Sequence, residues 1–347
     1  MCESEGLAVV TTPFTSAELD VAARLVGRFV PPTPQIAWPM LADAVGAEVW
    51  VKHENHTPTG AFKVRGGLVY VDRHVTEARG AGIMPRRLVS ATRGNHGQSL
   101  AFAGRAFGVD VTIVAPHGNS PDKNAAMRAF GADLIEEGHD FQAAREHAAL
   151  LAEQHGLVMV PSFHSDLVLG VATYAREFLL GAPELDVVYV PVGMGSGICA
   201  HIAVRDLLGL STEIVGVVAE NAPATALSFA AGHVVDTERA DTFIDGVACR
   251  APDATAIATI IAGASRIVQV SEDLCAEAVR MLYSTTHNMP EPAGAIALAA
   301  LLAERDVQRG RRVGVTMSGG NMDVPLMTRI LDGETPLPDH CAADPVT

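Results

Sequence analysis

The chain has 347 residues, of which 48% are apolar and only 5% are aromatic, and its formal net charge at pH 7 is -15. This length and composition predict a globular α/β enzyme built as one large unit or two modest domains. The acidic balance argues against a nucleic-acid partner.

The beginning of the chain, residues 1–14, lacks the basic start and the long apolar core of a signal peptide. The longest apolar run, residues 293–303, is too short to cross a bilayer. The five cysteines are scattered and form no CxxC pair, which predicts neither a zinc site nor a disulfide framework. We therefore expect a soluble cytoplasmic protein with no membrane partner.

Apolar runs rich in Val and Ile predict strands at 87–92, 109–116, 132–138, 157–161, 186–193, 213–220 and 311–319. Segments of helical periodicity predict helices at 99–108, 122–131, 141–156, 170–180, 199–209 and 272–286. Ser120 followed by Pro121 is a typical start for the second of these helices. Continuously apolar strands that alternate with helices predict parallel sheets buried on both faces. The polar, proline-rich tail after Leu331 is expected to be loosely ordered.

Three glycine-bearing loops follow predicted strands: RGNHG at 93–97, GMGSG at 193–197 and SGGN at 318–321. Ligands of open α/β sheets bind beyond the carboxyl ends of the strands, so three such loops predict one cleft. The 193–197 loop is not a Walker loop, and it best fits a single phosphate bound by backbone N–H groups at a helix start. The hydroxyl of Ser318 can hydrogen-bond a ring nitrogen without imposing a charge.

Lys63 lies in an apolar and glycine-rich stretch, residues 54–67, with few other charges nearby. A lone lysine is usually a solvated surface charge, and that alternative stays open at this point. Partial burial would instead lower its pKa and free its lone pair for imine chemistry.

Six segments in this order resemble the fold-type II pyridoxal-phosphate enzymes: TGAFKVRGG (59–67), SATRGNHGQ (90–98), PVGMGSG (191–197), DGVA (245–248), EPAGA (291–295) and SGGN (318–321). Within that class the sequence looks most like the serine/threonine dehydratase (threonine ammonia-lyase) group, which includes serine racemases. The resemblance extends from about residue 32 to residue 323.

The resemblance implies a tryptophan synthase β-like fold of two three-layer α/β/α domains with mostly parallel sheets. A small domain at 87–165 would close over the cleft of a discontinuous large domain at 1–86 and 166–347, which binds the cofactor. No C-terminal regulatory domain is expected, and the assembly would be a homodimer.

The resemblance also assigns roles to individual residues. Lys63 would be catalytic and would carry pyridoxal phosphate, while Asn95 would contact the 3′ oxygen of the cofactor. Phe62 would lie against its ring with Glu291 nearby, and Ser318 would contact the pyridine nitrogen. The phosphate would be held by Gly193, Met194, Gly195, Ser196 and Gly197. The α-carboxylate of the substrate would be bound by Thr92, Arg93, Gly94, Asn95 and His96.

The implied reaction is β-elimination from an L-β-hydroxy amino acid, giving a 2-oxo acid and ammonia. Threonine, serine, 3-hydroxyaspartate or a bulkier relative would be the substrate. An amino-acid racemase, a β-replacement synthase and a non-catalytic protein that binds the cofactor are the alternatives.

Arg93 departs from the group, in which this position is normally a small residue. Arginine stays protonated, so it is a poor second base, and this argues against racemisation. Arg93 would either clamp a substrate carboxylate or turn outward to pair with a surface acid.

The divalent-cation site of the group would use Glu220 and the carbonyl of Ala224. The next expected carboxylate falls near Ala226, which cannot bind a cation, and a hard cation needs several oxygen ligands. We therefore expect no bound metal.

Overall fold

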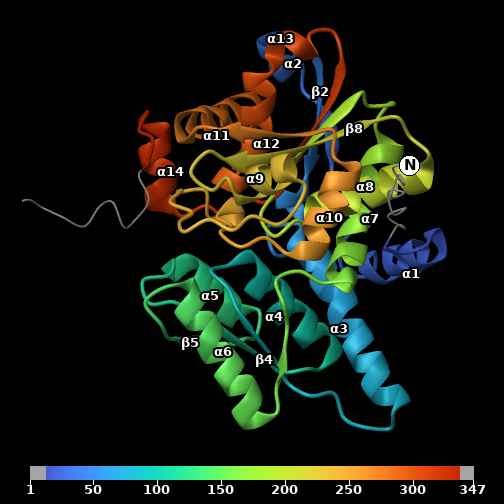
Figure 1. The fold of residues 1–347 in the computed structure, drawn as a ribbon, viewed down its shortest axis with the longest axis vertical. Coiled ribbons are helices and arrows are strands. Elements are labelled where there is room, and N and C mark those ends of the chain that lie inside the picture. Colours follow the sequence, from blue (N-terminus) through green and yellow to red (C-terminus); the bar gives the residue numbers. More distant parts are fainter. Residues whose placement is uncertain (1–12, 337–347) are drawn as a thin grey trace, which may run out of the picture.

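The computed structural model describes residues 13–336, which form two β-sheets with helices packed against them (Figure 1). The larger sheet has six strands in the order β1-β2-β10-β7-β8-β9. Their bounds are β1 Gln35–Ala37, β2 Glu48–His53, β7 Val187–Pro191, β8 Glu213–Ala219, β9 Arg266–Val270 and β10 Arg312–Met317. β1 runs antiparallel to β2, and all other neighbours in this sheet are parallel.

The smaller sheet has four parallel strands in the order β5-β4-β3-β6. Their bounds are β3 Leu88–Ala91, β4 Val111–Ala115, β5 Asp133–Glu136 and β6 Val158–Met159. In Figure 1 this sheet and its helices form the lower part of the molecule, and the six-stranded sheet lies in the upper part.

Alternate residues of the central strands enter two different cores, as the pleat of a strand requires. Val188 and Val190 of β7 face one core, and Val187 and Tyr189 face the other. The first core receives side chains from α1 Ser16–Val26, α3 Lys63–Gly80, α4 Asn95–Phe107, α5 Pro121–Ala129, α7 Ser165–Gly181, α8 Ser196–Leu208, α9 Ala224–Ala231 and α10 Ala254–Gly263. The second receives them from α2 Pro39–Val45, α11 Glu272–Thr286, α12 Pro292–Ala303 and α14 Val324–Leu331.

The four-stranded sheet is likewise covered on two faces. Val89 of β3 packs with Ala144 and Ala148 of α6 Phe141–His155, whereas Leu88 belongs to the core that contains α4. Three short helices complete the chain: η1 Glu54–His56, η2 Asp245–Val247 and α13 Arg305–Gln308.

The α/β class and the predominantly parallel sheets are confirmed, and every predicted strand and helix is present. The Ser120 side chain accepts a hydrogen bond from the Lys123 N–H at 3.1 Å, as a helix cap should. The helix predicted from residue 99 in fact begins at Asn95, which places Asn95 and His96 in its first turn. Strand β2 escaped the prediction because its apolar run ends in Lys52 and His53, both of which are buried.

The six-stranded sheet takes its strands from 35–53 and 187–317, and the four-stranded sheet from 88–159. A small domain at 87–165 that moves against the remainder stays a prediction. None of the described helices is long and apolar enough to cross a membrane. Cys199, Cys249 and Cys275 are buried free thiols.

The predictions on a signal peptide and on a loosely ordered tail concern the two ends of the chain. Residues 1–12, with Cys2 and most of the stretch tested for a signal peptide, lie outside the described residues. Residues 337–347, with Cys341 and most of the tail predicted to be loosely ordered, also lie outside them. The last described helix, α14, ends at Leu331 as the composition change predicts.

Candidate active site

Lys63 is the first residue of α3, directly beyond the edge where β2 and β10 end. The backbone N–H of Phe62 donates to the Ser318 carbonyl at 3.0 Å, and Ala61 forms a β-bridge with Gly319. These two contacts bring the lysine and the SGGN loop together. The Lys63 amine lies 4.8 Å from the centroid of the Phe62 ring.

The electrostatic setting of Lys63 suits a nucleophilic amine. Burial lowers its pKa to about 8, while the nearby Glu291 carboxylate acts in the opposite direction. The neutral, nucleophilic form of this amine is therefore far more accessible near neutral pH than that of an ordinary lysine. The sequence prediction of a lysine with a lowered pKa agrees with this setting.

Asn95 is held from both sides. Its Nδ2 donates to Glu291 Oε1 at 2.6 Å, and its Oδ1 accepts from Asn321 Nδ2 at 2.7 Å. Asn321 Nδ2 also donates to the Thr59 carbonyl at 2.9 Å. The two side-chain partners fix the orientation of the Asn95 amide and leave one of its N–H groups free to meet a ligand.

Glu291 is a buried carboxylate at the start of α12. Burial raises its pKa, and the positive charge of Lys123 together with the bond from Asn95 partly offsets that rise. A carboxylate at a helix start is also favoured by the helix dipole.

The predicted carboxylate-binding loop turns sharply between β3 and α4. The Gly94 N–H donates to Thr92 Oγ1 at 3.1 Å, which holds the turn. His96 is buried, and its Nε2 has no hydrogen-bond partner among the described residues. Burial and the charge of Lys63 lower the pKa of His96 to about 3, so its imidazole is neutral at physiological pH.

A small cavity of about 10 Å³ opens between Lys63, His96, Ser162 and Ser196, with Gly66, Leu167 and Val171 as its remaining lining. It joins the lysine, the loop predicted for the carboxylate and the loop predicted for the phosphate. A larger hollow of about 240 Å³ lies between α1, α3 and α7. That hollow contains none of the predicted site residues. The candidate site is therefore identified by the residues that line the small cavity and not by cavity volume.

The 193–197 loop is shaped as a backbone cradle. Gly195 has φ 98°, a left-handed conformation that favours glycine, and α8 begins at the next residue, Ser196. A Cβ added at Gly193 would collide with the Gly246 carbonyl oxygen, so only glycine fits there. Gly197 lies in the first turn of α8, and the Met194 sulfur lies 3.6 Å from the Cys249 thiol. N–H groups at such a helix start suit an anion.

Ser318 is buried at the end of β10, and its hydroxyl donates to the Ala293 carbonyl at 3.0 Å. The side chain is therefore fixed by α12, the helix that begins next to Glu291. It brings a neutral hydroxyl to the site and no negative charge.

Arg93 points to an acid rather than into open solvent. Its Nη1 lies 3.7 Å from Asp245 Oδ1, and its side chain is 46% exposed. Asp245 also receives Lys123, whose Nζ lies 3.4 Å from Oδ2. Of the two alternatives for Arg93, pairing with an acid is the one present in this structure, although that acid borders the candidate site.

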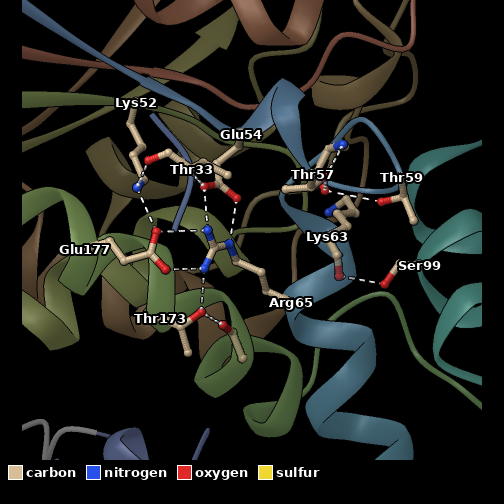
Figure 2. A network of polar contacts seen from close by, with 12 residues as sticks. Thr33, Lys52, Glu54, Thr57, Thr59, Lys63, Arg65, Ser99, Thr173 and Glu177 are labelled. Carbon is tan, nitrogen blue, oxygen red and sulfur yellow. Dashed lines mark hydrogen bonds and ion pairs between the residues drawn. The ribbon is translucent and has the colours of Figure 1, made fainter. Parts of the chain in front are cut away.

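A buried ionic cluster anchors the helix that carries Lys63. Figure 2 shows the Arg65 guanidinium between Glu54 and Glu177, which it binds through two hydrogen bonds each at 2.7–3.0 Å. Lys52 donates to Glu177 at 2.7 Å, and the Lys63 carbonyl accepts from Ser99 at 2.6 Å. The start of α3 is thereby tied to β2, α7 and α4.

The two weak metal candidates lie between the end of β8 and the start of α9. Glu220 is exposed just beyond β8, and the Ala224 carbonyl already accepts from the Ser228 hydroxyl at 2.7 Å. Across residues 13–336, no group of three or more His, Cys, Asp or Glu side chains could hold a metal ion.

Sequence reasoning missed several residues that border the site, namely Ser162, Lys123, Asp245, Asn321 and Arg65. Three of these stood inside motifs that were already recognised, but no role was assigned to them. Lys123 was placed on a helix, yet no local signal indicates which way a helical lysine points. Ser162 had no sequence signal at all.

Comparisons with known proteins agree with this geometry. The family model described as pyridoxal-phosphate dependent enzyme matches residues 26–319. An L-threonine ammonia-lyase from Thermotoga maritima is 33% identical over 295 residues, which cover 84% of this chain and 72% of that protein. An L-threo-3-hydroxyaspartate ammonia-lyase from Saccharomyces cerevisiae is 28% identical over 314 residues, covering 90% and 95%. The structure of the processed form of threonine deaminase isoform 2 from Solanum lycopersicum superposes with a TM-score of 0.85 at 27% identity, covering 96% and 99%.

Proposed function

The chain belongs to the family of pyridoxal-phosphate dependent enzymes, and from this membership we propose that it is an ammonia-lyase acting on an L-β-hydroxy amino acid. Pyridoxal phosphate is its cofactor. The reaction would remove water from the substrate, and hydrolysis of the released product would give a 2-oxo acid and ammonia. Similarity to ammonia-lyases over most of the chain supports this reaction class.

The residues at the site fit the cofactor. The 193–197 loop would hold the phosphate, because its glycines admit close approach and its N–H groups lie at a helix start. Lys63 would carry the cofactor through its amine, whose lowered pKa favours the neutral, nucleophilic form. Asn95 would meet the 3′ oxygen with its remaining N–H, and Phe62 would lie against the ring.

When bound, pyridoxal phosphate supplies an electron sink for the α-carbon of the substrate. Lys63 would then take the α-proton, since an amine with a pKa of about 8 can both accept and return a proton near neutral pH. Ser318 would face the ring nitrogen with a neutral hydroxyl, so it would not hold a proton there as a carboxylate would.

The loop at 92–96 would bind the α-carboxylate of the substrate through backbone N–H groups and short side chains. His96 is neutral and its Nε2 is free of partners among the described residues, so in the tautomer protonated at Nε2 it would donate a hydrogen bond to the carboxylate. Ser162 borders the same cavity and offers a second hydroxyl. Racemisation would need a second base opposite Lys63, and Arg93 is instead a cation paired with Asp245.

The observation that carries the proposal is the meeting of Lys63, His96 and Ser196 of the phosphate-type loop around one cavity. The test is release of 2-oxo acid by the purified holoenzyme from L-threonine, L-serine, D-serine and L-threo-3-hydroxyaspartate. We expect release from at least one L-substrate and none from D-serine. Accumulation of the opposite enantiomer, or product formation only with an added nucleophile, would overturn the proposal in favour of a racemase or a β-replacement synthase.

A cytoplasmic location and a homodimeric assembly stay predictions, as does closure of residues 87–165 over the cleft. Light scattering coupled to size-exclusion chromatography would test the assembly. Hydrogen exchange with and without the product 2-oxo acid would test closure, because slowed exchange confined to the 92–96 loop and its neighbours is expected.

A further inference from the structure

One carboxylate joins two cations at the edge of the candidate site. Asp245 is the first residue of η2, in the part of the chain that builds the six-stranded sheet. Its Oδ1 lies 3.7 Å from Arg93, and its Oδ2 lies 3.4 Å from Lys123. Both cations come from the part that builds the four-stranded sheet, so each oxygen of Asp245 pairs with a cation from the opposite side.

This bridge lies between the loops predicted for the substrate and for the phosphate. The alkyl stem of Lys123 packs so closely on Gly94 that an added Cβ would meet Lys123 Cδ at 2.9 Å. On the other side, the carbonyl of Gly246, the residue after Asp245, lies against Gly193. Because Arg93 belongs to the 92–96 loop and Lys123 packs on Gly94, the bridge adjoins the loop proposed to hold the substrate carboxylate.

Both cations of the bridge already have carboxylate partners among the described residues. Burial alone would lower the pKa of Lys123, but three nearby carboxylates outweigh it and raise that pKa; they belong to Asp245, Glu291 and Asp323. The Lys123 side chain is 14% exposed, so its charge is screened little by water. Arg93 has Asp245 as its ion-pair partner.

We propose that Asp245 makes the site selective for β-hydroxy amino acids with an uncharged side chain, because it occupies the two cations that a second substrate carboxylate would need. The inference rests on the proposed ammonia-lyase activity and names the substrate class within it. A substrate such as threonine leaves the bridge intact. A substrate such as 3-hydroxyaspartate has to displace Asp245 and then lies close to further acids.

The decisive variant is Asp245→Asn, which removes the charge and keeps the size. The matched control is Asp206→Asn on α8, an acid of similar exposure (46% against 44%) that pairs with its neighbour Arg205. The measurement is kcat/KM for L-threo-3-hydroxyaspartate divided by kcat/KM for L-threonine. We expect Asp245→Asn to raise this ratio by about tenfold or more, and the control to leave it unchanged.

A ratio that stays the same or falls in Asp245→Asn overturns the inference. A wild-type enzyme that already prefers the acidic substrate overturns it as well. Adding Lys123→Met to Asp245→Asn should reverse part of the gain, since Arg93 is then the one remaining cation of the two that Asp245 had paired. Asp245→Ser provides a second uncharged variant if the asparagine variant folds poorly.

A binding measurement separates this inference from the proposed reaction. Isothermal titration calorimetry of the holoenzyme with succinate, and with butyrate as the monocarboxylate reference, needs no turnover. We expect Asp245→Asn to bind succinate about tenfold or more tightly than the wild type, with butyrate unchanged. If no substrate yields an oxo acid, the proposed reaction fails while this arm still decides the inference; equal succinate affinities overturn the inference alone.

Discussion

Two clusters of charged side chains in this molecule differ in burial and in geometry. Around Arg65, both Arg65 and Glu54 are fully buried, and the hydrogen bonds are 2.7–3.0 Å long (Figure 2). Around Asp245, the side chains of Arg93 and Asp245 are 46% and 44% exposed, and the contacts are 3.4–3.7 Å long. The first cluster is saturated with partners, whereas the second is reached by solvent.

This difference indicates different roles. A buried charge cannot lose its partner without a large penalty, so the Arg65 cluster is committed to holding the start of α3. An ion pair that meets water contributes little to stability, so the Asp245 bridge is not needed to hold the fold. Similar residue types therefore hold the architecture in the buried cluster, and in the exposed cluster they are available for the recognition proposed above.

The largest expected effect on activity comes from Lys63, which belongs to neither cluster. Lys63→Ala should lower 2-oxo acid release by at least about 10³-fold, because it removes both the attachment amine and the proton acceptor. The absorption band of the lysine-bound cofactor should disappear with it. Circular dichroism should match the wild type, and activity within tenfold of the wild type would contradict the assignment.

Arg65→Met should have the largest effect on folding. It leaves Glu54 fully buried and without its guanidinium partner, so we expect the free energy of unfolding to fall by about 3–5 kcal/mol. Urea denaturation of the holoenzyme measures this. A variant as stable as the wild type would contradict the structural role assigned to the Arg65 cluster.

The pKa of Lys63 provides a prediction of intermediate size. In the protein without cofactor, the amine is protonated and unreactive below about pH 8 and becomes reactive above it, whereas an ordinary lysine does so near pH 10.5. Competitive acetylation across pH, read by mass spectrometry, measures this midpoint. Glu291→Gln should shift the midpoint downward, because the Glu291 charge raises the pKa of Lys63. A midpoint near that of the surface lysines would contradict the expected desolvation.

The smallest expected effect on stability belongs to Asp245→Asn. Asp245 and Arg93 are about half exposed and the contacts are long, while the partly buried Lys123 keeps Glu291 and Asp323 nearby, so the free energy of unfolding should change by less than about 1 kcal/mol. Urea denaturation of Asp245→Asn and Arg65→Met under the same conditions compares their free energies of unfolding. A loss as large as that of Arg65→Met would place Asp245 with the structural cluster instead.

Much of the fold could be read from the sequence. The continuous Val-rich runs at 187–191 and 213–219 had to be buried on both faces, and both lie in the middle of the six-stranded sheet. The strand at 48–53 could not be recognised, since its final residues are a lysine and a histidine. Lys52 is buried there only because Glu177, which lies 125 residues away in the chain, supplies a partner.

The candidate site could be predicted in part, because some of its residues stand in local sequence motifs. Lys63, Asn95, Ser318 and the 193–197 loop stand in short motifs whose residue types are informative on their own. The residues that orient these side chains could not be predicted, because they lie far away in the sequence. Asn321 and Glu291, which fix the Asn95 amide, lie 226 and 196 residues beyond it in the chain.

The sequence alone determined the α/β class, the family resemblance and the residues proposed to do the chemistry, because hydrophobic periodicity and short motifs are local properties. Only the tertiary structure decided what Arg93 faces. Its partner Asp245 lies in the part of the chain that builds the six-stranded sheet. Asp245 is also the partner of Lys123, which lies 122 residues away in the chain. Such pairs form when the two sheets and their helices pack together and bring loops from both parts into contact, and that packing depends on the whole chain.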